Sequence, residues 1–262
     1  MRAVVANGLT LHVQEGGDPA GLPIIFANSL GTDLRLWDAL LPHLPTGLRL
    51  IRYDMRGHGL SDCPPGPYAL SDLAADAAGL ITALDLGPAV FVGLSIGGMV
   101  GQLLAAQRPD LVRALVLSNT AARMGTPQMW QDRIAAIQSQ GLGALESAIL
   151  DRWFGTRFRS LPEAALWGAM LTRTPVSGYL GCCGAIAGAD LTDTTRALRL
   201  PVLCIAGSHD GASPPDHVAA TAALVPGASF HVIDGAGHLP CVENPTAYAA
   251  CLVPFLKEQT HV

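Results

Sequence analysis

The sequence of 262 residues has few charged side chains and a single lysine, Lys257, among its 16 basic residues. Charged residues make up 14% of the chain, and the formal net charge is −5. The basic residues are spread along the chain without a cluster, so we expect no electrostatic attraction to nucleic acid or to an anionic membrane. Gly-Lys-Ser and Gly-Lys-Thr are also missing, which excludes a P-loop for nucleotide phosphates.

Long apolar runs and paired cysteines are missing as well. No stretch approaches the ~18 apolar residues that span a bilayer, and residues 1–16 lack the pattern of a signal peptide, so we expect a cytoplasmic protein. The six cysteines form no C-x-x-C pair, and no histidine pair has i, i+4 spacing with a glutamate, which predicts neither a disulfide framework nor a metal site. Cys182 and Cys183 stand in an apolar stretch and are predicted to be packed thiols without a catalytic role.

The segment 89–101 has the pattern of a buried strand, a sharp turn and the start of a helix. Its first residues form a continuous apolar run, which is typical of a parallel strand covered on both faces. Gly93, Ser95 and Gly97 then form a G-x-S-x-G nucleophile elbow, which holds the serine hydroxyl on a strained bend. Glycine is required on both sides because Cβ atoms there would clash where the strand and helix backbones approach. Ser95 is therefore the predicted nucleophile.

Strands and helices alternate on both sides of this elbow, which predicts an α/β fold with a mostly parallel central sheet flanked by helices. The alternation stops after the strand at 112–117 and resumes with the strand at 201–207. The stretch between them has no convincing β pattern and contains three of the four tryptophans, so we expect an all-helical lid inserted after the sixth strand. The predicted organisation is a core of residues 1–122 and 200–262 and a lid of residues 123–199, with helices at 129–140, 145–154, 163–171 and 178–187.

An acid and a base follow the elbow along the chain, each just beyond a predicted strand. Asp210 stands on the loop after the strand that resumes the alternation, and His238 stands on a glycine-rich loop. Ser, Asp, His is the chain order of a triad built on a nucleophile elbow, in which His238 accepts the Ser95 proton and Asp210 orients the imidazole. Asp234 and Asp216 are competing acids, but neither directly follows a buried strand as Asp210 does.

Two backbone N–H groups are candidates for an oxyanion hole. Ile96 directly follows the nucleophile at the N-terminus of a predicted helix, and Leu30 lies in the loop after the strand at 23–27. That loop begins with Asn28 and Ser29 where His-Gly is usual, so Leu30 is assigned by its position in the chain.

The turn 54–62 has the pattern D-x-R-G-x-G-x-S and contains another histidine, His58. His58 is a candidate base, but no nearby group is expected to orient it as one. We therefore expect His58 and Arg56 to stabilise the turn. The segment 71–86 is predicted to form an amphipathic helix with Asp72 and Asp76 on its outer side.

Taken together, these residues resemble the 3-oxoadipate enol-lactonases of the α/β-hydrolase superfamily, and the resemblance covers essentially the whole chain. The marks of the superfamily are the turn 54–62, the elbow, the region 207–210 and Gly237-His238. The more specific motifs are Asn-Ser-Leu-Gly-Thr-Asp-Leu-x-x-Trp at 28–37, Trp-x-x-Arg-Ile at 130–134, Arg-Trp-Phe at 152–154 and Gly-Tyr-x-Gly-Cys-Cys at 178–183. The resemblance implies the α/β-hydrolase fold and a role in the protocatechuate or catechol branch of aromatic degradation, the β-ketoadipate pathway. It also implies that Asn28-Ser29 belongs to this subgroup.

The implied reaction opens an enol-lactone ring by serine attack and needs no cofactor. The implied substrate carries a carboxylate on an acetate arm, and an arginine of the lid is expected to bind it. Trp130, Arg133 and Ile137 stand at positions i, i+3 and i+7 and therefore share one face of a predicted helix. This face would direct an aromatic wall and a cation toward the nucleophile. The alternative is that Arg133 faces solvent and that Arg152 or Arg173 binds the carboxylate. The predicted substrate contacts are Trp130, Arg133 and Trp153.

The same scaffold also suits other functions. Within enzymes, the alternatives are a carboxylesterase, a cofactor-free haloperoxidase and a hydrolase of carbon–carbon bonds; a haloalkane dehalogenase is disfavoured because its nucleophile is Asp where this chain has Ser95. Outside enzymes, the alternative is a binding module with a degenerate site, which is disfavoured because all three triad residue types are present. The predicted partner is therefore a small-molecule lactone with a carboxylate, with no nucleic acid and no membrane, and the residues carry no signal of an oligomeric state.

Overall fold

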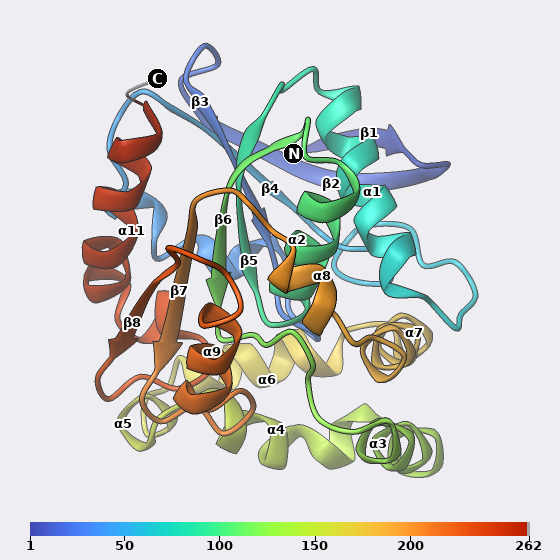
Figure 1. The fold of residues 1–262 in the computed structure, drawn as a ribbon. Helices are drawn as coiled ribbons and strands as arrows, with labels where there is room; N and C mark the ends of the chain where they lie inside the picture. The colour runs from blue at the N-terminus through green and yellow to red at the C-terminus, as the bar shows by residue number, and fades with distance from the viewer. Residues whose placement is uncertain (261–262) are drawn as a thin grey trace.

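The computed structural model describes residues 1–260, which form an eight-stranded sheet with the order β1-β2-β4-β3-β5-β6-β7-β8 (Figure 1). The pairs β1–β2 and β2–β4 are antiparallel, and every pair from β4 to β8 is parallel. The mostly parallel sheet agrees with the predicted fold class. The strands are β1 (Arg2–Ala6), β2 (Leu9–Gly17), β3 (Leu22–Ala27), β4 (Leu48–Tyr53), β5 (Ala89–Leu94), β6 (Val112–Ser118), β7 (Val202–Gly207) and β8 (Ser229–Ile233).

The central strands are apolar along their whole length because both faces of the sheet are covered. Every residue of β5 and of β7 is buried, as expected for parallel strands between two layers of helices. The edge strand β1 alternates between exposed and buried residues and was missed in the sequence. Its signal was Asn7-Gly8, where both residues have positive φ, of 49° and 77°, as a tight hairpin turn to β2 requires.

Helices flank this sheet in two groups. One group contains α1 (Leu70–Ala83), α2 (Ile96–Gln107) and α9 (Pro215–Ala222). Helix α1 contacts α2, and α9 packs on β7 and β8; Figure 1 draws α2 and α9 in front of the strands. The other group contains α10 (Pro240–Glu243) and α11 (Pro245–Thr260), which contact the short 3₁₀ helices η1 (Leu34–Trp37) and η2 (Leu41–His43). Among residues 1–260, none of the helices has the length and apolar character needed to cross a membrane.

The segment between β6 and β7 contains helices joined by loops and no strand, and we call it the helical insertion. The four helices expected there are present within two residues of the predicted bounds, and the short helices α5 and α8 were not expected. In Figure 1, α3 to α7 form a layer of their own beyond one end of the strands. The elements are α3 (Pro127–Gln140), η3 (Leu142–Leu145), α4 (Glu146–Trp153), α5 (Thr156–Arg159), α6 (Ala164–Thr172), α7 (Val176–Ala187) and α8 (Thr192–Arg196).

The prediction for Asp76 was wrong. Its side chain is not on the outer face of α1 but buried, with 2% of the residue exposed. The Arg56 guanidinium donates to both carboxylate oxygens, from Nε at 2.6 Å and from Nη2 at 2.7 Å. A buried carboxylate is stable only when it is paired in this way, so the pair ties the turn after β4 to α1. Helical periodicity does not reveal a partner that comes from another part of the chain.

The adjacent cysteines of α7 are packed thiols. Cys182 and Cys183 are both fully buried, and burial raises the pKa of each thiol, in Cys183 to about 12. A thiol with so high a pKa is not a nucleophile near neutral pH. These two side chains therefore contribute to packing.

Replacing both cysteines by alanine is expected to lower the free energy of unfolding by about 1 kcal/mol or more, because each sulfur leaves a void. Urea unfolding of the double variant, beside Cys63→Ala at an exposed position, measures the difference. Turnover of an activated ester should be unchanged. A folded double variant without turnover would contradict a purely structural role.

Candidate active site

Ser95 lies on a strained turn between β5 and α2. Its φ is 58° and its ψ is −121°, a conformation that side chains other than glycine rarely adopt. A Cβ on Gly93 would lie 2.2 Å from the carbonyl oxygen of Gly97, and a Cβ on Gly97 would lie 2.3 Å from that of Ala27. The two glycines therefore permit a backbone contact among β3, β5 and α2 that no other residue type allows. This contact holds Ser95 at the carboxyl end of the central strand.

Asp210 and His238 form a buried pair. The Nδ1 atom of His238 lies 2.8 Å from Oδ2 of Asp210, and both side chains are almost completely buried. Asn119, the residue that follows β6, donates to the same carboxylate oxygen at 2.8 Å. The backbone N–H groups of Ala212 and Ser213 donate to Oδ1 at 2.6 and 2.9 Å. Each oxygen of this carboxylate thus accepts two hydrogen bonds. The Oδ2 atom, which accepts from the imidazole, therefore has a fixed position.

The competing acid Asp234 does not reach His238; its carboxylate accepts a hydrogen bond from the Ser208 hydroxyl at 3.2 Å. Burial by itself opposes ionisation of Asp210. The charge of His238 and the hydrogen bonds from His238, Asn119 and Ser213 outweigh burial and hold the pKa of Asp210 below its usual value. The carboxylate is therefore ionised at neutral pH and orients the imidazole with its proton on Nδ1.

A small cavity of about 140 Å³ brings the predicted residues together. Ser95 and His238 line it from the core, Leu30 from the loop after β3, and Arg133 from α3. Trp130 and Trp153 of the helical insertion also line the cavity. Ile96 is the first residue of α2, where a backbone N–H has no acceptor within the helix.

Two arginines of the helical insertion line the same cavity, Arg133 and Arg152. The Arg133 guanidinium lies 5.5 Å from the ring centroid of Trp130 and 5.8 Å from that of Tyr179. Aromatic faces therefore hold it, and no carboxylate of the described residues pairs with it. The Arg152 Nε donates to the carbonyl of Gly211 at 3.1 Å. Burial, together with the charge of Arg133, lowers the pKa of Arg152. The sequence did not single out Tyr179 as a site residue, because its place beside the cation depends on how α3 and α7 pack.

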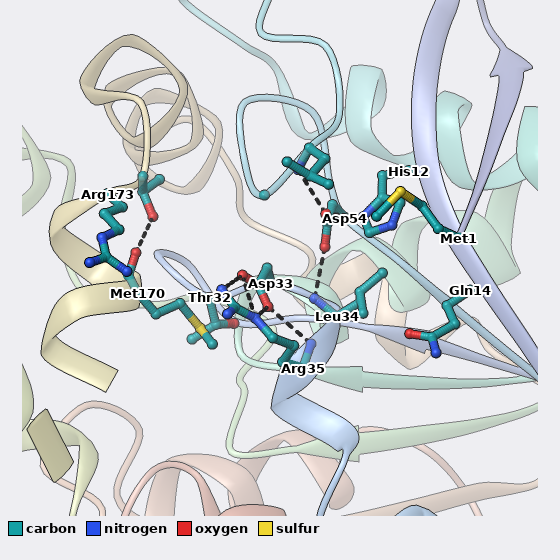
Figure 2. Close-up of a pocket in the computed structure, with 13 residues that line it drawn as sticks. Met1, His12, Gln14, Thr32, Asp33, Leu34, Arg35, Asp54, Met170 and Arg173 are labelled. Atoms are coloured by element: carbon teal, nitrogen blue, oxygen red, sulfur yellow. Dashed lines mark hydrogen bonds and ion pairs between the residues drawn. The ribbon is translucent and has the colours of Figure 1, made fainter. Parts of the chain in front are cut away.

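The third arginine considered from the sequence, Arg173, lies elsewhere. It lines a larger cavity of about 600 Å³, shown in Figure 2, together with His12, Asp33 and Asp54. The loop after β3 contributes Leu30 to the small cavity and Thr32, Asp33 and Leu34 to the larger one, so it forms the wall between them. Arg173 is therefore not beside Ser95.

The loop that carries Leu30 is held by Asn28, the residue that replaces the usual histidine. Asn28 is fully buried; its amide donates to the carbonyl of Tyr53 at 2.8 Å and accepts from Nε1 of Trp37 at 2.8 Å. The Trp37 ring packs against Phe26 of β3 with centroids 5.0 Å apart. This side chain therefore joins β4 and η1 through the loop after β3, which we call the oxyanion loop because Leu30 is the predicted oxyanion donor.

The helical insertion is tied to the loop that carries His238. The carbonyl of Trp153 accepts the backbone N–H of His238 at 2.7 Å. The Glu243 carboxylate accepts the N–H of Gly155 at 2.9 Å and that of Gly237 at 2.6 Å, so one side chain joins the insertion to the histidine loop. Within the residues that the structure describes, no group of three or more His, Cys, Asp or Glu side chains is arranged to hold a metal ion.

The low pKa of Asp210 predicts a pH-dependent contribution to stability. Because the folded-state pKa lies below the unfolded value of about 3.9, the carboxylate stabilises the fold above that pH, and this contribution is lost as the pH falls through the folded-state pKa. Asp210→Asn is therefore expected to destabilise the protein most at pH 7 and progressively less under acid. Urea unfolding of both proteins from pH 7 to pH 3 measures this difference, with Asp234→Asn as the control. If Asp210→Asn lowers the free energy of unfolding by the same amount at every pH, the charge of Asp210 does not contribute to stability.

Comparison with known proteins agrees with this geometry. The model of the alpha/beta hydrolase fold family matches residues 23–245. The chain is 32% identical to 3-oxoadipate enol-lactonase 2 of Acinetobacter baylyi over 97% of its own length and 96% of that protein. The enol-lactonase of Burkholderia xenovorans LB400 superimposes with a TM-score of 0.94 at 35% identity, covering 98% of this chain and 100% of that one.

A second similar structure is that of a thermophilic esterase from Thermogutta terrifontis with malate bound. It has a TM-score of 0.91 at 29% identity and covers 98% of both chains. The strained serine turn, the sheet order and these similarities, which extend along the whole chain, lead to one conclusion: the chain belongs to the alpha/beta hydrolase fold family and is an ester-hydrolysing enzyme of the enol-lactonase type.

Proposed function

We propose that the protein opens 3-oxoadipate enol-lactone to 3-oxoadipate with Ser95 as nucleophile, His238 as base and Asp210 as its partner. The observation that carries this proposal is the small cavity, which is lined by Ser95, by His238 and by Arg133, a cation with no carboxylate partner within residues 1–260. An enzyme that hydrolyses simple neutral esters needs no cation in its cavity, whereas an enzyme whose lactone substrate carries a carboxylate does. The relatives named as 3-oxoadipate enol-lactonases support the same substrate.

The reaction begins when Ser95 Oγ attacks the lactone carbonyl and His238 Nε2 takes its proton. The negative charge that develops on the carbonyl oxygen is stabilised by the N–H groups of Leu30 and Ile96. Asp210 accepts a hydrogen bond from the Nδ1–H of the imidazole and stabilises the imidazolium. Leu30 lines the cavity of Ser95 and α2 begins at Ile96, directly after the nucleophile, which supports this pair of donors.

Collapse of the tetrahedral intermediate breaks the bond to the ring oxygen and leaves an acyl-enzyme. His238 returns its proton to the departing enolate oxygen, and the enol becomes a ketone by tautomerisation. Water, activated by the same imidazole, then attacks the acyl carbon; Ser95 leaves, and the new carboxylate makes the product a dicarboxylate. No step uses a cofactor.

The carboxylate arm of the substrate is assigned to Arg133. Trp130 and Tyr179 hold the guanidinium at the cavity without neutralising it, so its N–H groups remain available for a bidentate pair. Trp153 supplies a further apolar wall. The esterase relative with bound malate shows that a protein of this fold binds a small dicarboxylate.

In this proposal, the helical insertion is a lid, with boundaries at 123–199 between core segments 1–122 and 200–262. It supplies the cation and the aromatic walls, and the core supplies the nucleophile, acid and base. The proposed physiological role is the lactone-opening step of aromatic degradation in the cytoplasm.

We expect each of three substitutions to reduce hydrolysis by at least ~10³-fold in a folded protein, because the three residues act as a unit. The substitutions are Ser95→Ala, His238→Ala and Asp210→Asn. Steady-state turnover of the enol-lactone and of an activated neutral ester measures the loss, and circular dichroism checks the fold. Should Asp210→Asn keep nearly full activity while Asp234→Asn loses it, the assignment of the acid would be wrong.

Arg133→Ala is expected to lower kcat/KM for the enol-lactone. The corresponding activation free energy should rise by about 2–4 kcal/mol, the range for losing a charge-assisted pair in a site shielded from water. Hydrolysis of a neutral ester should hardly change, because its transition state has no carboxylate to bind. Arg173→Ala is the matched control, since that arginine lines the other cavity.

Equal losses on both substrates in Arg133→Ala would indicate a misfolded insertion. If Arg133→Ala loses nothing and Arg152→Ala loses lactone activity selectively, Arg152 binds the carboxylate. A wild-type protein that hydrolyses neutral esters faster than the enol-lactone would refute the proposed substrate.

A further inference from the structure

His58 contacts the oxyanion loop directly, a contact that the sequence did not reveal. The backbone N–H of Gly31 donates to Nε2 of His58 at 3.0 Å. On the other side of the ring, Nδ1 lies 3.2 Å from the carbonyl oxygen of Arg56. Because Nε2 accepts, the proton of the neutral imidazole is on Nδ1 and is donated to that carbonyl. The ring therefore links the turn after β4 to the loop after β3.

The imidazole remains neutral in this position. His58 is buried, with 1% of the residue exposed, and burial lowers its pKa against the opposing charges of Asp54 and Asp33. A protonated ring would direct a second donor at the Gly31 N–H and would lose the hydrogen bond. The acceptor at Nε2 is thus present throughout the neutral range.

Gly31 is the third residue of a tight turn. The N–H and the hydroxyl of Thr32 both donate to the carbonyl of Ser29, at 3.2 and 2.8 Å. Gly31 has a φ of 78°, as this position of a type II turn requires, and a Cβ there would lie 2.6 Å from Leu171 of the insertion. The turn is therefore fixed between His58 and α6.

Leu30 is the second residue of this turn, and its N–H donates to no other protein group within residues 1–260. The hydrogen bond to His58 fixes the peptide group that follows Leu30. Farther along the loop, the N–H of Leu34 donates to Oδ1 of Asp54 at 2.8 Å, as Figure 2 shows. Two side chains of the turn 54–62 thus hold the oxyanion loop at two points.

We propose that His58 is a positioning residue for the oxyanion hole: by accepting the Gly31 N–H, it directs the free N–H of Leu30 at the carbonyl oxygen under attack by Ser95. His58 does not line the cavity of Ser95, so it acts through the loop and contacts no substrate. The inference rests on the acyl transfer of the proposed function but not on the identity of the lactone. It also differs from a role as base, for which His58 would have to reach the nucleophile.

The test compares His58→Leu with His58→Gln on an activated neutral ester such as p-nitrophenyl acetate. Leucine removes the acceptor, whereas the Oε1 of glutamine reaches the position of Nε2 and accepts the same N–H. We expect His58→Leu to lower kcat by about 10–100-fold with KM changed less than about twofold, because an oxyanion donor acts mainly in the transition state. His58→Gln should recover kcat to within a few fold of the wild type.

Ser61→Ala is the matched control. Its hydroxyl donates to the carbonyl of Asp54 at 2.6 Å and accepts the N–H of His12, but it does not touch the oxyanion loop. This variant should lose stability and keep kcat. A second readout is inhibition by a boronic acid, whose tetrahedral adduct with Ser95 needs the oxyanion hole; its affinity should fall in His58→Leu in parallel with kcat.

The inference is overturned if folded His58→Leu keeps wild-type kcat, or if His58→Gln is as slow as His58→Leu. A loss of kcat in Ser61→Ala as large as that in His58→Leu would also overturn it, because general loosening of the turn would then explain both. Failure of the wild type to hydrolyse any ester would instead refute the proposed function. Failure on the enol-lactone alone would leave the role of His58 intact.

Discussion

A backbone contact without side chains underlies the whole site. β5 delivers the chain to Ser95 at a φ of 58°, and α2 leaves the turn so closely that its second residue touches the carbonyl of Ala27 at the end of β3. Only glycine fits at 93 and 97, and the strained serine between them persists because the buried sheet on both sides leaves it no other conformation. This contact also brings the loop after β3, and hence Leu30, to the nucleophile.

Around this turn, the side chains of Asp210, Asn28 and His58 are buried, and each has fixed hydrogen-bond partners. The Asp210 carboxylate receives hydrogen bonds from β6, from its own loop and from His238, whereas Asn28 and His58 orient the oxyanion loop. In a site of low dielectric constant, such fixed donors stabilise a developing charge without having to reorganise. Arg133 differs in having aromatic neighbours in place of a carboxylate, which leaves its charge available to a ligand.

Sequence reasoning succeeded with most local signals, strand β1 being an exception, and failed where the signal depends on a distant partner. The α/β class, the family and the enzyme type were predicted correctly. Ser95 and His238 line one cavity and Asp210 contacts His238, and their catalytic roles remain a prediction. Asp76 was misplaced because an amphipathic pattern records apolar positions and does not reveal an arginine from another segment. Strand β1 was missed although Asn7-Gly8 carried its hairpin signal. The choice among Arg133, Arg152 and Arg173 depended on which cavity each arginine lines.

The sequence by itself determined the parts of this protein that depend on backbone conformation and residue order. The G-x-S-x-G turn demands glycine for steric reasons, and buried strands followed by Asp210 and His238 place polar groups at one edge of a parallel sheet. Only the tertiary structure decided which side chains meet across elements: Tyr179 beside Arg133, Glu243 between two loops, and His58 beneath Gly31. The reason is physical. A hydrogen bond or a cation–π contact depends on positions within a few ångströms, and these are set by the packing of segments that lie far apart in the chain.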